Sequence, residues 1–517
     1  MCGIAGYLNL NGRSYDPAGS NYLPAMMKSI THRGPDENGS IIVGPAALSM
    51  TRLAIIDLKT GQQPIFNEDE SICIVFNGEI YNFEELRDRL LANGHQFRTG
   101  SDTEVIVHLY EELGVDCLKH LEGMFAFALW DSNKKRLFLA RDRMGEKPLH
   151  WSIFDGQFIF ASEIKSILEH PAASKSLNAE ALRQYLALES VPAPNTLFRD
   201  IYKLLPAHYM VIEQGKVNIA SYWTPSMEVS DMGEAEAKEK LLALLDESIR
   251  LRLISDVPLG VFLSGGIDSS TIAALAAKHT SGRLKTFSIG FSDSSFDESN
   301  HARTVADHLG TSHQVMEFQP DLAFATMQEL WQVLDEPIAD ASIVPTFLLA
   351  KMTKESVTVA LSGEGGDELL GGYPTYQAHR LAGIWNKIPQ ILRGGILEPL
   401  INSLPVSHKN LSFDYKLKRF IASSKHEPLA RQLRWMGGLP MDTHQSLLRP
   451  SLFEDAGSMS DELDLISHLD LDLLYRRLKK EDVVDQIMRL DQMTYLADDL
   501  LVKSDRATMA ASLEARL

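Results

Sequence analysis

A cysteine follows the initiator methionine directly in the opening stretch MCGIAGY. Because Cys2 is small, the methionine before it would normally be trimmed, which leaves one residue with both a thiol and a free α-amino group. The thiolate is the reactive form of cysteine, and the amine is a base that could generate it. The N-terminus therefore predicts a nucleophile with its own general base, provided that the rest of the sequence has a use for one.

A glycine-rich turn in the second half of the chain has the form of a phosphate-binding loop. In GVFLSGGIDSSTIAALAAKH, residues 261–263 predict a buried strand, residues 264–267 a tight turn and the residues from Asp268 a helix. Glycines let the backbone close on a phosphate, and the first N–H groups of a helix point at it. The expected phosphate ligands are Ser264, Gly265, Gly266, Ser269 and Ser270.

This loop differs from the common nucleotide loops. No Gly-Lys-Ser/Thr follows the glycines, so it is not a Walker A loop. An acid such as Asp268 would repel a phosphate unless Mg²⁺ bridges the two, so we expect Asp268 to bind magnesium. A glycine turn with a Ser/Asp helix cap is the simple alternative. The strand, both glycines, the acid and the paired serines together favour phosphate binding.

A second loop, VALSGEGGDELLGG, repeats this form. A strand leads into Ser362 and Gly363, and Glu364 and Asp367 follow beside more glycines. If the two strands are parallel neighbours, their loops face each other at one edge of the sheet. Asp268 and Asp367 would then share a metal ion, with Glu364 as a base or orienting group. On its own this loop reads equally well as a solvent-exposed acidic turn.

Composition limits the class of protein. The chain has 517 residues, 44% of them hydrophobic and 23% charged, which is typical of a soluble protein of roughly two to four domains. The net charge of −19 argues against nucleic acid or an anionic membrane as the main partner. With three cysteines, no signal peptide and no apolar run of membrane-spanning length, we expect a cytoplasmic protein without a disulfide framework.

The pattern of elements changes near residue 225. Before it, short β-like runs alternate with a few helices, and two apolar runs flanking DSNKK predict a hairpin. The polar, acidic stretch TPSMEVSDMGEAEAKEK is the best linker candidate. After it, strands and helices alternate, which predicts a parallel sheet with ligands at the carboxyl ends of its strands. Beyond about Gln377 the pattern is mostly helical.

The two loops carry a resemblance to a known family. SGGIDSS resembles the pyrophosphate loop of ATP-pyrophosphatases, and SGEGGDE is similar to its partner loop in glutamine-hydrolysing asparagine synthetases. The resemblance implies cleavage of ATP between the α and β phosphates to give an acyl-adenylate, with Glu364 assisting adenylation and ammonia attack and with Mg²⁺ on Asp268 and Asp367. DEPIADAS (335–342) also resembles a family segment, placed near the acceptor carboxylate. The residues implied to hold adenosine are Leu263, Ile289, Ser362 and Gly363.

An acyl-adenylate that becomes an amide needs ammonia, and this gives Cys2 a purpose. The thiolate would attack the side-chain amide of glutamine, with the α-amine, whose pKa is about 8, moving the proton. In FNGEIYNF, the Asn77 side chain and the Gly78 N–H can form an oxyanion hole. Glu79 and Asp102 could hold the α-ammonium of glutamine, and Arg52 its α-carboxylate. Singly, these residues read equally well as a hairpin turn, a helix cap and a surface cation.

The order of motifs favours the functional reading. CGIAG, HRGPD, RLAIIDL, FNGEIYNF, SDTEV, MFAFALWD and ARDRMGEKPL resemble the class II glutamine amidotransferase domain. The resemblance implies an α+β N-terminal-nucleophile hydrolase sandwich (αββα) over residues 2–225. Residues 226–517 would then form an α/β parallel-sheet ATP-pyrophosphatase domain of the adenine nucleotide α-hydrolase type. The implied glutamine-binding residues are Arg52, Leu53, Ile55, Asn77, Gly78, Glu79 and Asp102.

Two features depart from the family pattern. The sequence ends KSDRATMAASLEARL, where the family continues into a Pro-Phe-Leu-Asp segment and a lysine-bearing helical region. Either the sequence is a fragment, or the protein has lost part of its synthetase site. We expect a helix that runs unterminated to Leu517, which favours a fragment. His150 stands where the family usually has tyrosine. Cys73 and Cys117 are expected to be buried small hydrophobic residues.

Three functions compete. The first is an ATP-dependent amidotransferase that makes asparagine from aspartate and glutamine. The second applies the same chemistry to another carboxylate, such as a uronic acid in surface-polysaccharide synthesis, and shares every motif. The third is a non-catalytic regulatory or scaffold protein. The expected partners are therefore small molecules, with no nucleic acid and no membrane, and the oligomeric state stays open, a homodimer included.

Overall fold

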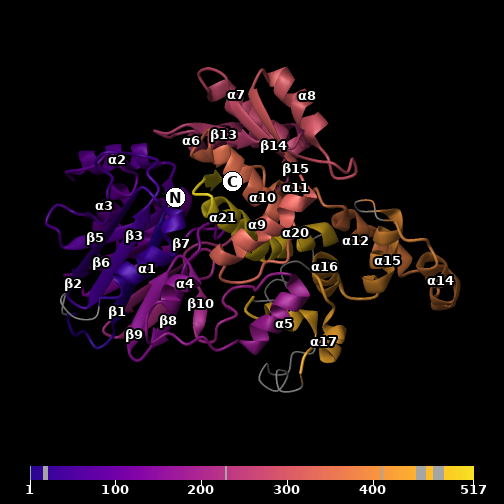
Figure 1. Cartoon of the computed structure of the whole chain (residues 1–517), viewed down its shortest axis with the longest axis horizontal. Coiled ribbons are helices and arrows are strands. Elements are labelled where there is room, and N and C mark those ends of the chain that lie inside the picture. Colours follow the sequence, from indigo (N-terminus) through magenta and orange to yellow (C-terminus); the bar gives the residue numbers. More distant parts are fainter. Residues whose placement is uncertain are drawn as a thin grey trace.

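The N-terminal half of the protein is built on two stacked antiparallel sheets (Figure 1). The computed structural model describes residues 2–15, 21–226, 230–407, 409, 412–449, 461–469 and 482–517. One six-stranded sheet has the order β10-β8-β9-β1-β3-β2 and comprises β1 (Gly3–Asn9), β2 (Glu37–Val43), β3 (Ala46–Arg52), β8 (His150–Phe154), β9 (Gln157–Ala161) and β10 (Ile201–Lys203). The other has the order β12-β11-β7-β6-β5-β4 and comprises β4 (Ile65–Phe66), β5 (Ile72–Ile80), β6 (Gly123–Asp131), β7 (Arg136–Arg141), β11 (His208–Glu213) and β12 (Lys216–Ser221).

Helices cover the outer faces of both sheets. Apolar side chains of α1 (Leu23–Ser29) and α4 (Ile164–Leu168) pack on the first sheet, and those of α2 (Phe83–Ala92) and α3 (Glu104–Leu113) pack on the second. A third cluster fills the space between the sheets. Every residue of β5 is buried because the strand is covered on both faces. The predicted αββα sandwich is confirmed, as is the hairpin between β6 and β7. The other elements of this half are η1 (Thr31–Arg33), η2 (Gly114–His120) and α5 (Ala179–Leu188).

The second half is built on a five-stranded parallel sheet with the order β15-β14-β13-β16-β17. Its strands are β13 (Leu259–Phe262), β14 (Lys285–Phe291), β15 (Ser312–Phe318), β16 (Val359–Leu361) and β17 (Glu514–Arg516). Helices α6 (Glu234–Arg252), α7 (Ile267–His279) and α8 (Ser299–Leu309) pack on one face, and α9 (Pro320–Val333), α10 (Ile343–Lys354) and α21 (Leu501–Ala510) on the other. The predicted α/β domain is therefore confirmed. The boundary predicted at residue 225 falls between β12 and α6 and stays a prediction.

The region after the second loop is mostly helical, as predicted. Helices α12, α16 and α20 share an apolar core, and Figure 1 shows this region, in orange, extending to one side of the parallel sheet. The elements are α11 (Gly366–Leu370), α12 (Pro374–Trp385), α13 (Gln390–Leu392), η3 (Arg393–Leu397), α14 (Glu398–Asn402), α15 (Phe413–Ser423), α16 (Pro428–Met436), α17 (Met441–Leu447), η4 (Glu462–Ile466), α20 (Val483–Met493) and η5 (Leu496–Leu500). No helix among the described residues is both long enough and apolar enough to cross a membrane.

The prediction of a helix through Leu517 is wrong. Helix α21 ends at Ala510, Ser512 takes a left-handed conformation with φ of 54°, and residues 514–516 form β17 beside β16. Strand pairing buries all three residues of β17, and the Arg516 guanidinium donates to the Arg252 and Ile254 carbonyls. This long-range pairing outweighs the local helix preference of an alanine-rich segment.

Helix α21 lies between the sandwich and the parallel sheet (Figure 1). Arg33 of η1 forms two hydrogen bonds to the Asp505 carboxylate, of 2.8 and 3.0 Å, and a third of 2.9 Å to Glu163. Arg506 pairs with the same Glu163 oxygen at 2.7 Å. All four side chains are buried, so neutralisation by a partner is essential for each charge. We call Arg33, Glu163, Asp505 and Arg506 the boundary cluster.

Replacing Asp505 by asparagine should destabilise the protein strongly. The variant leaves the buried Arg33 with an incompletely neutralised charge, a defect that typically costs roughly 3–5 kcal/mol. In urea denaturation, this loss should lower the urea concentration at the midpoint of the first unfolding transition. The control is Glu234→Gln, which breaks the exposed Glu234–Lys238 pair and should cost under about 1 kcal/mol. Equal effects of the two variants would contradict the structural role of the boundary cluster.

Candidate functional site

Cys2 lies immediately before β1 and contributes to the core between the two sheets, with 6% of its surface exposed. Its backbone N–H donates to Asn77 Oδ1 at 3.0 Å, and its carbonyl accepts from Arg33 Nε at 3.1 Å. Burial raises the pKa of the thiol, while the Leu53 N–H and the Arg52 charge act against this rise. The residue is thus fixed at both of its backbone polar groups.

In the Asn77 side-chain amide, the oxygen has a hydrogen-bond partner among the described residues and the nitrogen does not. Its Nδ2 is buried and has no hydrogen-bond partner among the described residues. Leaving a buried donor unpaired costs about 1–3 kcal/mol, so a ligand oxygen at this point would be stabilised. Its neighbour Gly78 must be glycine, because a Cβ there would lie 2.1 Å from the Met124 carbonyl oxygen. An unused donor therefore belongs to the same side chain that binds the Cys2 backbone, which is what the predicted oxyanion hole requires.

The two carboxylates predicted to hold an ammonium group are both buried. Asp102 accepts from the Ile80 N–H at 2.8 Å, and burial raises the pKa of Asp102 to about 6. Burial, then the charges of Glu514 and Asp102, raise the pKa of Glu79 well above its usual value. Glu79 Oε2 is buried without a hydrogen-bond partner in the described chain. A ligand cation would relieve this excess of buried acid.

Arg516 of β17 also reaches these carboxylates, a contact that the sequence did not indicate. Its Nη2 lies 3.6 Å from Glu79 Oε1, and its Nε donates to Glu514 at 2.7 Å. A strand of the parallel sheet therefore contributes a cation beside Glu79. The segment was read as a helix, and no local signal in it indicates this long-range contact.

Arg52 lies near Cys2, but its guanidinium has partners of its own. Nη1 donates to Glu37 at 2.8 Å, and Nη2 donates to the Ile56 and Asp57 carbonyls at 3.0 and 2.7 Å. The side chains of Leu53 and Ile55 are buried in an apolar cluster with Val359 of β16. The proposed contacts of these residues with glutamine stay predictions.

A cleft of about 400 Å³ lies at the carboxyl ends of the parallel strands. Strands β13 and β16 are parallel neighbours, so the two predicted loops do face each other. The predicted residues that line the cleft are Leu263, Ser264, Gly266, Asp268, Ser269, Ile289, Ser362, Gly363, Glu364 and Asp367.

Gly265 and Ser270 are not among the lining residues of this cleft. Gly265 has φ of 86°, and a Cβ on it would meet the Ala302 backbone N at 2.4 Å, so it allows α8 to approach the loop. Ser264 and Ser269 join their hydroxyls at 2.9 Å across the turn. The hydroxyl of Ser270 is buried and lacks a partner in the described residues.

The two metal-binding candidates repel each other. Burial and the charge of Asp268 raise the pKa of Asp367. The absence of a side chain on Gly366 makes room for the Asp268 carboxylate, because a Cβ there would lie 2.7 Å from its Cγ. A divalent cation between the two carboxylates would remove the repulsion, and oxygen ligands of this kind suit Mg²⁺. The donor set therefore fits the predicted ion.

Two residues of α21 complete the cleft and were missed from the sequence. Lys503 lines it, with Nζ 3.1 Å from Asp340 Oδ2 and 3.6 Å from Glu364 Oε1. Burial opposes its charge, but Glu364 and Asp340 raise the pKa of Lys503. The hydroxyl of Ser504 donates to Glu364. In the sequence these residues belong to the polar run KSDR within α21, which by itself does not indicate a contact with Glu364.

The segment 335–342 serves mainly as a contact between the two halves. Asp335 accepts from the Ile164 N–H at 2.7 Å, and Glu336 accepts from the Leu197 N–H at 2.6 Å. Of the acids in this segment, it is Asp340 that reaches Lys503 at the cleft. The expectation that the whole segment lies near the acceptor carboxylate is therefore too broad, because Asp340 is the acid of this segment that reaches the cleft.

Two protein-family models match separate parts of the chain. Residues 1–223 match the family model of the glutamine amidotransferase domain, and residues 240–517 match that of asparagine synthase. Asparagine synthetase [glutamine-hydrolyzing] 1 of Bacillus subtilis is 33% identical over 527 residues, which cover all of this chain and 79% of that protein. The chain belongs to the asparagine synthase family.

Other matches are more partial. Asparagine synthetase [glutamine-hydrolyzing] 2 of Bacillus subtilis is 36% identical over 401 residues, covering 72% of this chain and 52% of that protein. A solved glutamine phosphoribosylpyrophosphate amidotransferase of B. subtilis aligns with a TM-score of 0.34 at 15% identity, over 61% of this chain and 81% of that structure.

The chain thus belongs to a family of ATP-dependent ligases, whose relatives named above are glutamine-hydrolysing asparagine synthetases. At the family's usual tyrosine position, His150 is buried with Nδ1 3.0 Å from the Ser162 carbonyl oxygen. Burial and the nearby charges of Arg506 and Lys203 lower the pKa of His150 well below its usual value. It therefore fills the boundary between the halves as a neutral side chain.

Cys73 and Cys117 are buried and unpaired, as predicted.

Replacing Asp102 by asparagine should change how the free energy of unfolding depends on pH. Because the pKa of Asp102 is raised from 3.8 to about 6, the folded state holds a proton that the unfolded state releases. This residue's stability contribution is complete below pH about 4 and is lost as pH rises through about 6, by up to roughly 3 kcal/mol. D102N should therefore gain stability relative to the parent over this range in urea denaturation.

The control for this measurement is Asp88→Asn, on an exposed position of α2. Its stability relative to the parent should not change in the same way between pH about 4 and 7. If the difference in the free energy of unfolding between D102N and the parent did not change with pH, this would contradict the raised pKa of Asp102.

Proposed function

We propose that the protein transfers the side-chain nitrogen of glutamine to a carboxylate activated by ATP, with aspartate as the acceptor and asparagine, AMP and pyrophosphate as products. The observation that carries the proposal is helix α21, which contacts Glu364 directly and is linked to Cys2 through Arg33. Lys503 and Ser504 contact Glu364 at the cleft, and the next residue, Asp505, binds Arg33, which donates to the Cys2 carbonyl. One short segment thus joins a nucleophile to a nucleotide cleft.

Glutamine hydrolysis would begin at Cys2 once the initiator methionine has been removed. The α-amine takes the thiol proton, and the thiolate attacks the side-chain amide carbon of glutamine. The oxyanion is stabilised by Asn77 Nδ2 and the Gly78 N–H. The amine returns its proton to the leaving nitrogen, ammonia departs, and water cleaves the resulting thioester to glutamate.

Recognition of glutamine would rest on charge. Glu79 and Asp102 would hold its α-ammonium group, whose charge would add to that of Arg516 beside their buried carboxylates. The guanidinium of Arg52 would face its α-carboxylate.

At the cleft, the acceptor carboxylate would attack the α-phosphorus of ATP and release pyrophosphate. The loop N–H groups and the hydroxyls of Ser264 and Ser269, which line the cleft, would bind the phosphates. Asp268 and Asp367 would hold Mg²⁺, which supplies charge neutralisation for the phosphate oxygens. Glu364 would accept a proton as ammonia attacks the acyl carbon and AMP leaves, with its position fixed by Ser504 and Lys503.

A carboxylate acceptor other than aspartate would use the same residues of both sites. A uronic acid or another carboxylate would need no change in either site, so it stays the alternative. A regulatory or scaffold role without catalysis would not require a free buried donor beside Cys2. We also propose a cytoplasmic location, which three unpaired cysteines support, and a homodimer as the assembly to test.

Pyrophosphate release with Mg-ATP and glutamine, measured with and without aspartate, tests the proposal. We expect release that depends on aspartate, with asparagine formed in equal amount. Cys2→Ala should abolish release with glutamine and retain it with added ammonium. No response to aspartate, beside intact glutamine hydrolysis, would move the assignment to another carboxylate. Loss of both activities in Cys2→Ala would contradict the separate roles of the two sites.

Replacing Asn77 by alanine should lower kcat for glutamine hydrolysis by about 10²–10³, the usual cost of losing one oxyanion donor. Synthesis with added ammonium should stay unchanged, because Asn77 has no role at the cleft. The control is Asn82→Ala, which removes a loop contact to the His120 carbonyl and should leave kcat unchanged. A fall of less than threefold for Asn77→Ala would exclude it from the oxyanion hole.

A further inference from the structure

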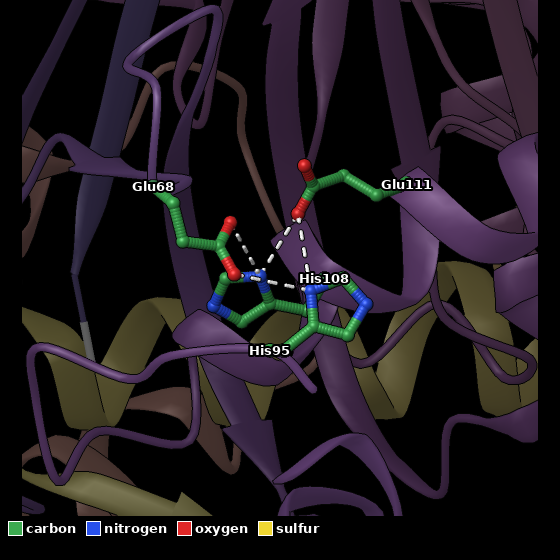
Figure 2. Close-up of side chains that lie close together, drawn as sticks. All are labelled: Glu68, His95, His108 and Glu111. Atoms are coloured by element: carbon green, nitrogen blue, oxygen red, sulfur yellow. Dashed lines mark hydrogen bonds and ion pairs between the residues drawn. The ribbon is translucent and has the colours of Figure 1, made fainter. Parts of the chain in front are cut away.

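Four side chains on the sandwich meet at a point that the proposed chemistry does not use. Glu68 follows β4, His95 lies between α2 and α3, and His108 and Glu111 stand one turn apart on α3. One nitrogen or oxygen atom from each lies within 4.8 Å of all the others. Figure 2 shows both imidazoles and both carboxylates converging on one point.

The spacing of these atoms matches that around a tetrahedral metal ion. His108 Nδ1 lies 2.9 Å from Glu111 Oε2 and 3.5 Å from Glu68 Oε2. His95 Nδ1 lies 3.2 Å from Glu68 Oε1 and 3.7 Å from Glu111 Oε2. Ligands at about 2.0–2.1 Å from a zinc ion stand roughly 3.4 Å apart in a tetrahedron. Only small side-chain adjustments would be needed to place an ion at the centre.

The second ring nitrogen of each histidine faces a carboxylate, at a distance just beyond that of a hydrogen bond. The second ring nitrogen of a histidine ligand usually faces a carboxylate, which fixes its tautomer and orientation. His108 Nε2 lies 3.6 Å from Glu104 Oε1, and His95 Nε2 lies 3.6 Å from Glu112 Oε1.

These outer carboxylates are themselves held in place. Glu104 accepts from the Arg98 and Thr99 N–H groups, at 2.7 and 2.8 Å. Glu112 accepts from the side chain of Asn93 at 2.7 Å. Each histidine therefore has one ring nitrogen that faces the centre of the cluster and a second that faces a carboxylate held by other contacts.

The cluster is rigid on one side and open on the other. The His108 side chain is fully buried, whereas those of Glu68, His95 and Glu111 are 34%, 17% and 23% exposed. Two neutral imidazoles and two carboxylates balance the charge of one divalent ion. Imidazole and carboxylate donors in a tetrahedral set suit Zn²⁺ better than Mg²⁺, which prefers six oxygen ligands.

We propose that Glu68, His95, His108 and Glu111 form a structural zinc site. The ion would fasten three segments of the sandwich together: the residues after β4, the connection from α2 to α3, and α3 itself. With all four ligands supplied by the protein, the site has no open position for a substrate. The alternative is a purely ionic cluster, in which the facing carboxylates of Glu104 and Glu111 overcome burial and raise the pKa of His108 to about 9.

Zinc titration of the metal-free full-length protein tests the site. A Cys2→Ser background removes a thiol that would itself bind zinc. Competition with a chromophoric chelator should give one tight site per chain, and X-ray absorption should show nitrogen and oxygen ligands at about 2.0–2.1 Å. His95→Ala should weaken binding at least 100-fold, and Glu112→Gln by about 10–100-fold.

The matched control is His120→Ala, which removes an exposed histidine of the same domain and should leave zinc affinity unchanged. Zinc should also raise the thermal midpoint of the control, but not that of His95→Ala. Equal zinc affinity in these two variants, or no zinc bound at micromolar concentration, would overturn the proposal and leave the ionic cluster. Neither readout depends on the proposed enzymatic activity.

Discussion

The pairing of Arg33 with Asp505 is the interaction on which the arrangement of both sites depends. A guanidinium that is fully buried is tolerated only when its hydrogen bonds are satisfied, and Arg33 uses Asp505, Glu163 and the Cys2 carbonyl for this. Small displacements of α21 relative to η1 would therefore be costly. The position of the nucleophile relative to the helix that supports Glu364 is consequently fixed by electrostatics rather than by apolar packing alone.

Both sites share an excess of buried or half-buried acid. Near Cys2, Glu79 and Asp102 have raised pKa values because burial disfavours their charge. At the cleft, Asp367 behaves in the same way beside Asp268. In the proposed function, an α-ammonium group near Cys2 and magnesium at the cleft would each add a positive charge beside these carboxylates. A cation placed there would favour their charged forms and lower their pKa values.

Local patterns in the sequence were sufficient for much of the fold and for the inner parts of both sites. Cys2 and Asn77 could be placed together because both belong to short motifs, and the cleft residues followed from two glycine loops on parallel strands. Arg33, Lys503 and Arg516 could not be found in this way, since their partners lie in distant parts of the chain. The error at β17 has the same cause: residues 514–516 form a strand only because β16 offers an unpaired edge.

Strand β17 has a consequence for biosynthesis. Residues 2–221 contain every strand of the sandwich, so this half can fold on the ribosome while the rest is still being made. The parallel sheet, by contrast, gains β17 only after residues 514–516 have left the exit tunnel. The same strand carries Arg516 to Glu79. A nascent chain would thus hold a folded sandwich in which Glu79 still lacks Arg516, and would complete both proposed sites at almost the same moment.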